Sequence, residues 1–151
     1  MLHALSDEKV KFLLVGVYAL TAHGYPQAAM DIDIGVMPSP QNADAALRAL
    51  CRFGTPLHNL TKEDLQKDGT IFQIGVAPRR IDIITAASGL QFEETYGRSL
   101  SVNIEGIEVH IPSIDDLIRN KRAIGRTKDL ADAEALESLK TSKQIATPDK
   151  E

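Results

Sequence analysis

Apolar and polar positions in the first third of the chain predict two strands, each followed by a helix. Residues 11–16 form a short apolar run that ends in glycine, which indicates a buried strand. Residues 17–23 have helical spacing and are followed by Gly-Tyr-Pro, a helix stop signal. A second strand is predicted over residues 30–36, which lead to two prolines, and a second helix over residues 41–53, which end at a glycine.

The middle of the chain predicts two hairpins. Residues 54–70 are polar and are expected to form mostly loop. Strands are predicted over residues 70–76 and 81–84, with a turn at residues 77–80 between them. Residues 101–111 alternate on both sides of a central Glu-Gly pair, which predicts a second, smaller hairpin.

The C-terminal part predicts a pair of helices. Ser113, with Asp116 three residues later, resembles a capping box that opens a helix ending at the next glycine. A second helix is predicted over residues 127–139, whereas residues 140–151 are polar and aperiodic and are expected to be disordered. We therefore expect one domain over residues 1–139 of α/β (α+β) class, a mixed sheet flanked by helices with a C-terminal helical pair.

Composition excludes several classes of protein. The net charge of -4 argues against broad affinity for nucleic acid, and the absence of Trp argues against base stacking as a main binding mode. The single cysteine, Cys51, excludes an internal disulfide and a cysteine-based zinc site, and we expect it to pack on an apolar helix face. No signal peptide or membrane-spanning run is recognisable, so a cytoplasmic protein is the expectation.

Candidate chemistry begins with Asp31 and Asp33, which alternate with isoleucine in the second predicted strand. Side chains two residues apart on a strand share a face, roughly 6.5 Å apart at Cα. Carboxylates held so close favour a divalent cation, and Mg²⁺ takes one or two carboxylates plus substrate phosphates. The alternative is an ordinary strand with one solvated face.

Asp82 is a lone acid in the apolar run 81–84. If its strand lies beside the strand of Asp31, a third carboxylate joins the first two on one face. Three acids on adjacent strands can hold two metal ions, which assist displacement at phosphorus. The alternative is that Asp82 faces water.

Two further residues could meet phosphate. Gly16 lies between a strand and a helix, where backbone N–H groups bind phosphates, although glycine also serves ordinary turns. Lys121 falls on the apolar stripe of the helix that starts at Ser113, so its charge needs an anion such as a triphosphate, unless it reaches solvent from the stripe edge.

Residues 119–128 are rich in Arg and Lys and contain no acid, so phosphate binding is plausible there. For Asp129 and Asp132, which follow, we expect helix-dipole and ion-pair roles. The four histidines have no partner at ligand spacing and are expected to be structural or surface residues, with two of them in loops; they are His3, His23, His58 and His110.

Together these residues resemble a known family. Leu14-Val-Gly16, a short helix ending in Gly-Tyr, and then Asp31-Ile-Asp33 resemble the nucleotidyltransferase superfamily of the DNA polymerase β fold. The segment Ile111-Pro-Ser-Ile-Asp-Asp-Leu-Ile-x-x-Lys121, followed by Gly-Arg126-x-Lys-Asp129-x-x-Asp132, resembles the small bacterial branch that includes the AbiEii-type toxin proteins. The resemblance covers roughly residues 10 to 139.

The resemblance implies transfer of a nucleoside monophosphate from an NTP to a hydroxyl, with Mg²⁺ or Mn²⁺. It implies that three carboxylates bind metal and act in catalysis, namely Asp31, Asp33 and Asp82. It further implies that the nucleotide phosphates meet the loop and the basic residues, namely Gly16, Val17, Lys121 and Arg126. The acceptor could be RNA, a protein or a small molecule.

Two positions depart from the family pattern. Val17 stands where Gly or Ser is usual, and Gln27 stands where an Arg often precedes the paired carboxylates. A second hypothesis is therefore a nucleotide-binding or regulatory module with little or no catalysis, for example one half of a toxin–antitoxin pair, with a cognate antitoxin or self-association. A glycosyltransferase with the same carboxylate motif fits poorly, because Asp82 would have no role.

Overall fold

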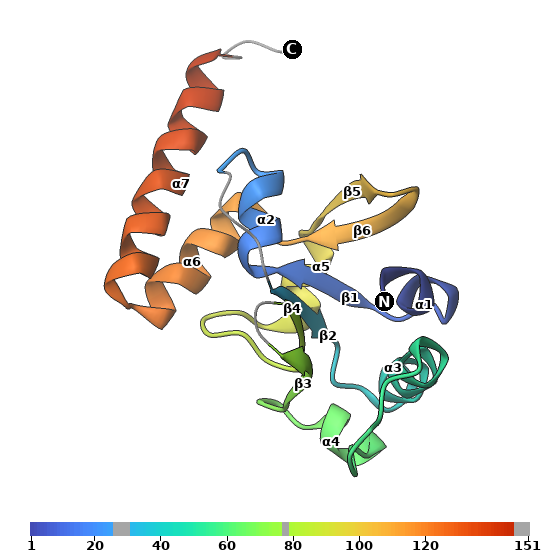
Figure 1. Ribbon diagram of the computed structural model, residues 1–151. Helices are drawn as coiled ribbons and strands as arrows, with labels where there is room; N and C mark the ends of the chain where they lie inside the picture. The colour runs from blue at the N-terminus through green and yellow to red at the C-terminus, as the bar shows by residue number, and fades with distance from the viewer. Residues whose placement is uncertain (26–30, 77–78, 147–151) are drawn as a thin grey trace.

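A computed structural model describes residues 1–25, 31–76 and 79–146 of the chain (Figure 1). The helices are α1 (Leu2–Asp7), α2 (Gly16–Ala22), α3 (Pro40–Phe53), α4 (Lys62–Gln66), α5 (Phe92–Gly97), α6 (Ile114–Ile124) and α7 (Thr127–Ala146). The strands are β1 (Phe12–Val15), β2 (Ile32–Val36), β3 (Ile71–Val76), β4 (Arg79–Ile84), β5 (Leu100–Ile104) and β6 (Ile107–Ile111).

The strands form one mixed sheet in the order β3-β4-β2-β1-β6-β5. The central pair β1–β2 is antiparallel, and each of its members has a parallel neighbour on the outer side, β6 and β4 respectively. The outer pairs β3–β4 and β5–β6 are the two hairpins expected from the sequence. The predicted mixed sheet flanked by helices is therefore confirmed.

Alternation along the strands gives the sheet one apolar face and one partly polar face. Leu14, Ile34 and Ile83 lie on the apolar face and are almost wholly buried in the main core, which α1 and α3 complete with residues such as Leu5 and Leu50. The opposite face carries the acidic residues of β2 and β4. Ile34 and Ile83 thus point into the core, while Asp33 and Asp82, one residue before each of them, point to the opposite face.

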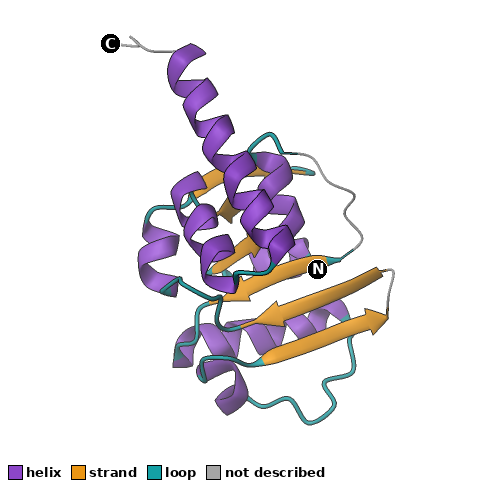
Figure 2. Ribbon diagram, turned by 90° about the vertical axis from the view of Figure 1, so that its left-hand side faces the viewer, coloured by secondary structure: helices purple, strands orange, loops and turns teal. Residues whose placement is uncertain are grey.

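α5, α6 and α7 lie at the other side of the sheet's central strands, whereas α4 packs against α3. In Figure 1, α6 and α7 stand together at the left, with α2 between them and the strands, whereas α1 and α3 lie to the right. Figure 2 shows the same arrangement from the side of α6 and α7. α6 ends as the sequence predicts, at Gly125, whose φ of 76° is the left-handed conformation that glycine adopts most easily.

Several details differ from expectation. α1, α4 and α5 have only five or six residues each, too short for a periodic apolar pattern, and the sequence did not predict them. His3 therefore lies in a helix rather than a loop. β4 begins at Arg79, inside the predicted turn, because its pairing with β3 extends to that residue.

Two further expectations were wrong. α7 continues to Ala146, so residues 140–146 of the expected disordered tail are helical; they contain no Gly or Pro, and Lys140 pairs with Asp115 of α6 at 2.6 Å. Cys51 is exposed rather than packed, because α3 buries the face that carries Ala46, Ala49 and Leu50. No helix among the described residues is long and apolar enough to cross a membrane.

Candidate active site

The sheet register brings the predicted carboxylates to one face. Asp33 of β2 lies opposite Asp82 of β4 in the parallel pair, and Asp31 precedes Asp33 by two residues, so all three share that face. Burial, together with the negative charges of Asp82 and Asp31, raises the pKa of the Asp33 carboxyl, while the nearby cations Arg80 and Lys121 oppose the rise. The site therefore concentrates negative charge where a cation would be stabilised.

Arg80 is the counter-charge that the structure places within this cluster. Its Nε donates to Oδ1 of Asp82 at 2.9 Å, and its guanidinium lies 3.6 Å from Oδ2 of Asp31. Its backbone N–H also donates to Oδ1 of Asp31 at 3.2 Å. The sequence did not mark Arg80 as part of the site, because residues 77–80 were expected to form a turn; since β4 begins at Arg79, Arg80 shares the face of Asp82.

Gly16 brings the start of α2 against Asp33. Its φ is +67°, and a Cβ built there would lie 2.6 Å from Oδ2 of Asp33. A glycine is therefore required at this position both for the backbone conformation and for the close approach to the carboxylate. Val17 follows in the first turn of α2 and is half-buried.

Lys121 points inward from α6, as its position on the apolar stripe predicts, and the anions that pair with it are carboxylates of the protein itself. Its Nζ lies 3.5 Å from Oδ1 of Asp129 and 3.4 Å from Oδ2 of Asp132, and its side chain is only 12% exposed. Both aspartates belong to α7 and are almost completely buried. The ion pairs expected for them are confirmed, while triphosphate binding by Lys121 stays a prediction.

Arg126 and Lys128 extend this charged group toward solvent. Arg126 Nε donates to Oδ2 of Asp129 at 2.7 Å, and Lys128 Nζ donates to Oδ2 of Asp132 at 3.1 Å. The guanidinium of Arg126 lowers the pKa of the Asp129 carboxyl, and Lys121 lowers it further to a smaller extent. Since the Arg126 side chain is 75% exposed, it could meet a ligand without being buried.

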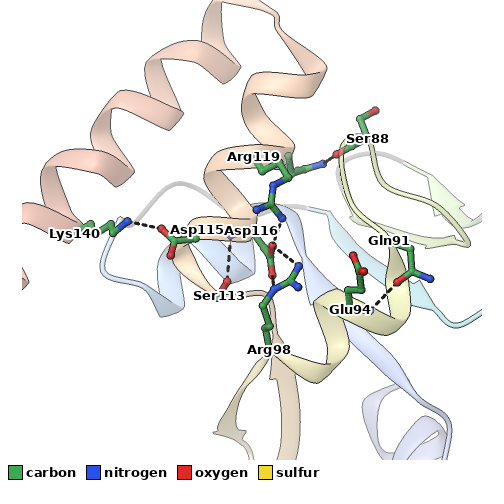
Figure 3. A network of polar contacts seen from close by, with 10 residues as sticks. Ser88, Gln91, Glu94, Arg98, Ser113, Asp115, Asp116, Arg119 and Lys140 are labelled. Atoms are coloured by element: carbon green, nitrogen blue, oxygen red, sulfur yellow. Dashed lines mark hydrogen bonds and ion pairs between the residues drawn. The ribbon is translucent and has the colours of Figure 1, made fainter.

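Another buried acid, Asp116, fixes the position of α6. Ser113 caps the helix by accepting from the N–H of Asp116, as the sequence predicts. The Asp116 carboxylate does not return to the cap; it accepts from Arg98 through two nitrogens, at 2.9 and 3.1 Å, and from Arg119 at 2.7 Å (Figure 3). These contacts tie α6, and with it Lys121, to the end of α5.

The chemistry of the donors fits a hard cation, but the donors do not converge. Among residues 1–25, 31–76 and 79–146, no three His, Cys, Asp or Glu side chains are placed to hold one metal ion. Arg80 bridges Asp31 and Asp82 instead. Because Mg²⁺ is usually held by one or two carboxylates plus substrate phosphates, a smaller donor set suffices for a metal that arrives with a nucleotide.

The histidines have the structural or surface roles expected of them. His23 is buried, with Nε2 2.8 Å from the carbonyl oxygen of Pro112, and His110 Nδ1 lies 3.0 Å from the Ser99 hydroxyl. The other two histidines are exposed. Gln27, the second departure from the family pattern, lies outside the described residues.

Comparison with known proteins bears on the fold. No protein-family model and no curated protein sequence matches the chain. The chain is similar in structure to TM1012 of Thermotoga maritima, described as a "putative nucleotidyltransferase", with a TM-score of 0.57 and 15% sequence identity, over 93% of this chain and 88% of that one. This chain has a nucleotidyltransferase-like fold. At such low identity the similarity establishes the fold, and the function has to be argued from the site.

Proposed function

We propose that this protein is a Mg²⁺-dependent nucleotidyltransferase that moves a nucleoside monophosphate from an NTP to a hydroxyl acceptor. The observation that carries the proposal is the pairing of Asp33 with Asp82 across β2 and β4, with Gly16 in contact range of Asp33. A nucleotidyltransferase-like fold supports it. The relationship to the AbiEii-type branch is part of the same proposal.

Three carboxylates would hold the cation, which Mn²⁺ could replace: Asp31, Asp33 and Asp82. When bound, the cation would neutralise charge on the phosphates and activate the attacking oxygen. Arg80 would have to move from Asp82 for that residue to join. A guanidinium released in this way could bind the phosphates that arrive with the cation, because Arg matches phosphate geometry through two parallel hydrogen bonds.

The acceptor hydroxyl oxygen would form a bond to the α-phosphorus of the NTP, while the bond from that phosphorus to the pyrophosphate oxygen breaks. Asp82 would accept the hydroxyl proton. The charge of the departing pyrophosphate would be offset by Lys121, Arg126 and Arg80. The backbone at Gly16 and Val17 would lie next to the pyrophosphate. Such electrostatic and positional effects dominate catalysis of phosphoryl transfer.

Calorimetry with Mg²⁺ and each NTP in turn tests the proposal. We expect heat of binding for the wild-type protein and none for the Asp31→Ala/Asp33→Ala variant. A matched control is Asp7→Ala/Asp44→Ala, because both residues are surface acids that pair with the surface bases Arg52 and Lys62. Equal absence of heat for the wild-type and the Asp31/Asp33 variant would exclude the enzyme.

The second candidate is a module that binds nucleotide without transferring it, such as one half of a toxin–antitoxin pair. Val17 favours it, because a branched side chain in the first turn of α2 crowds the backbone beside Gly16 and supplies no hydroxyl. Nucleotide binding without transfer of α-³²P label to any RNA, protein or small molecule of a lysate would favour this module. Robust label transfer would exclude it.

A further inference from the structure

A pocket of about 260 Å³ lies on the same face of the sheet as the carboxylates. Its floor is formed by three strands, through Leu13, Gly35 and Ile84, and α5 forms a wall through Phe92 and Thr95. Gly35 contributes no side chain, which leaves space above β2; a Cβ there would reach the Phe92 ring at 3.7 Å. Most of the lining is apolar, as in sites that bind small molecules.

Thr95 gives the pocket a hydroxyl group without a hydrogen-bond partner in the described part of the chain. It is fully buried in α5, and its hydroxyl finds no hydrogen-bond partner among the residues that the structure describes. Thr85, which also lines the pocket, accepts from the N–H of Thr70 and donates to the carbonyl of Lys67. A buried hydroxyl without a partner is costly, whereas the Thr85 hydroxyl is already bonded within the protein. Because Thr95 is 0% exposed, a ligand in the pocket would reach its hydroxyl only after a small rearrangement of the side chains around it, and the hydrogen bond gained would favour that rearrangement.

The register places this pocket directly beside the carboxylates. Val15, Asp33 and Asp82 form one row across β1, β2 and β4, and the next row along the same face is Leu13, Gly35 and Ile84. Rows of this kind are roughly 6.5 Å apart. Arg80 lies on the other side of the carboxylate row, two residues before Asp82. The carboxylates therefore separate a cation from an apolar pocket.

Charge at the pocket excludes phosphate. Its lining residues, all from the described part of the chain, include two exposed acids, Asp68 and Glu93, and no lysine or arginine. A triphosphate would be repelled there and attracted to Arg80. Since the attacking and leaving oxygens of phosphoryl transfer lie roughly in line, a leaving group on the Arg80 side places the attacking hydroxyl on the pocket side.

We propose that this pocket binds the ring of a small acceptor, neutral or cationic, whose hydroxyl reaches the carboxylate row while a polar atom on the ring bonds to Thr95. The inference rests on the proposed function and names its acceptor class. In the step it implies, the acceptor oxygen bonds to the α-phosphorus, the hydroxyl proton passes to a carboxylate, and pyrophosphate leaves.

Polar contacts hold α5, the wall of the pocket, at both of its ends. Arg98, which follows α5, is held by Asp116 of α6 (Figure 3), and Asn120 of α6 donates to the carbonyl of Ser88 in the loop before α5. The Gln91 side chain caps α5 by accepting from the N–H of Glu94. A pocket with fixed walls loses less entropy when it binds a ligand, which favours binding of a compact ring.

The first experiment titrates tyrosol, a phenol with a hydroxyethyl arm, into ¹⁵N-labelled full-length protein without metal or nucleotide. We expect saturable shifts of the amide signals of Gly35, Thr85 and Thr95. Thr95→Val should weaken tyrosol binding about fivefold and leave 2-phenylethanol, which lacks the phenolic oxygen, unchanged. The control is Thr141→Val, at an exposed threonine of α7. Shifts confined to other residues would overturn the proposal.

Folding does not confound this comparison. Valine has the shape of threonine, and Thr95→Val removes a hydroxyl that has no partner in the described part of the chain, so the variant should melt no lower than the wild type. If Thr95→Val does melt lower, Gly35→Ala gives a second measure, because its Cβ finds ordinary contact distances and occupies the pocket floor. It should weaken tyrosol and 2-phenylethanol alike, and unchanged affinity for both would overturn the proposal.

Charge provides the second experiment. Tyrosinol carries an ammonium group on a hydroxyl arm that is one carbon longer than that of tyrosol, and 4-hydroxyphenyllactate adds a carboxylate to the tyrosol frame, so the three compounds share the phenol ring and a nearby hydroxyl but differ in charge. We expect affinity to fall from tyrosinol to tyrosol to 4-hydroxyphenyllactate, and the spread to shrink in the Asp68→Asn/Glu93→Gln variant. The opposite order would overturn the proposal.

Competition separates the pocket from the nucleotide site. If adenosine displaces tyrosol and shifts the same amide signals, the pocket is the nucleobase site and the acceptor proposal is wrong. Heat from Mg²⁺ and ATP without any tyrosol binding would overturn the pocket proposal alone. Tyrosol binding without heat from any NTP would overturn the proposed function, and with it the acceptor role of the pocket.

Discussion

Arg80 Nε lies 2.9 Å from Oδ1 of Asp82, and the same guanidinium lies 3.6 Å from Oδ2 of Asp31. The arginine thus lies between two of the three carboxylates that the proposed function assigns to the metal. If a metal ion binds there, Arg80 competes with it for the same carboxylates until phosphate offers the arginine another partner.

The first prediction removes this competition. In Arg80→Gln we expect Mn²⁺ alone to bind several-fold more tightly, because the carboxylates lose the arginine that pairs with them. We expect ATP to bind about tenfold more weakly, because its phosphates lose a charge-assisted hydrogen bond. Electron paramagnetic resonance of free Mn²⁺ measures the first and calorimetry the second. Arg48→Gln, at an arginine that pairs with Glu8 on the surface, should change neither. Unchanged Mn²⁺ affinity in Arg80→Gln would contradict the competition.

The second prediction concerns Gly16. Gly16→Ala adds strain of about 1 kcal/mol at a positive φ and forces the Asp33 carboxylate to move. Gly106→Ala is the matched control, because Gly106 also has a positive φ, +84°, but a Cβ there meets nothing within 4 Å. Both variants should melt at similarly reduced temperatures, whereas only Gly16→Ala should lose label transfer, at least tenfold. Equal transfer by the two variants would show that Asp33 does not depend on Gly16.

The sequence predicts most of the sheet because its strands are either short apolar runs or alternate between apolar and polar residues. Asp31, Asp33 and Asp82 are found as acids within such strands. Three short helices were missed, although Thr61 and Asp64 form a capping box that marks the start of α4. Neither the pocket nor its unpaired Thr95 could be predicted, since both depend on how α5 lies over the strands. Periodicity reports which side of an element is apolar, whereas a cavity depends on the packing of several elements.

The charges around Lys121 show the same limit. The position of Lys121 on an apolar stripe predicts that an anion pairs with its charge, and the structure provides such anions. That position does not indicate whether the anion is a ligand phosphate or a protein carboxylate. The deciding fact is that α7 turns back along α6, so that Asp129 and Asp132 face the lysine. Tertiary structure supplies that partner, and local sequence does not.

A third prediction uses this buried pair. Asp129→Asn leaves the Lys121 charge with one buried carboxylate fewer, and we expect the free energy of unfolding to fall by about 3 kcal/mol. Asp115→Asn, which breaks the surface pair with Lys140, should leave the melting temperature nearly unchanged. Thermal unfolding at pH 7 measures both. Similar melting temperatures would mean that Asp129 does not stabilise the fold.

The Asp129 prediction also has a pH dependence. The pKa of Asp129 is lowered in the folded protein, mainly by Arg126, so its charged form stabilises the fold above its ordinary pKa. That stability is lost as the pH falls through the lowered pKa. The difference in unfolding free energy between wild type and Asp129→Asn should therefore shrink below about pH 4. A difference that persists unchanged in acid would assign the effect to packing rather than to charge.

The fourth prediction concerns Asp33, whose pKa is shifted in the opposite direction to that of Asp129. Burial and the charges of Asp82 and Asp31 raise the Asp33 pKa, so the folded state holds its proton more firmly than the unfolded state does. Stability from this residue is present in acid and is lost as the pH rises through the raised pKa. In metal-free protein, Asp33→Asn should therefore raise the melting temperature at pH 7, by an amount that decreases toward pH 3, while abolishing label transfer. A lower melting temperature at pH 7 would show that the Asp33 charge stabilises the fold through Arg80 and Lys121. A higher melting temperature together with loss of label transfer is the result expected of a catalytic carboxylate, because such a residue lowers stability while it is needed for activity.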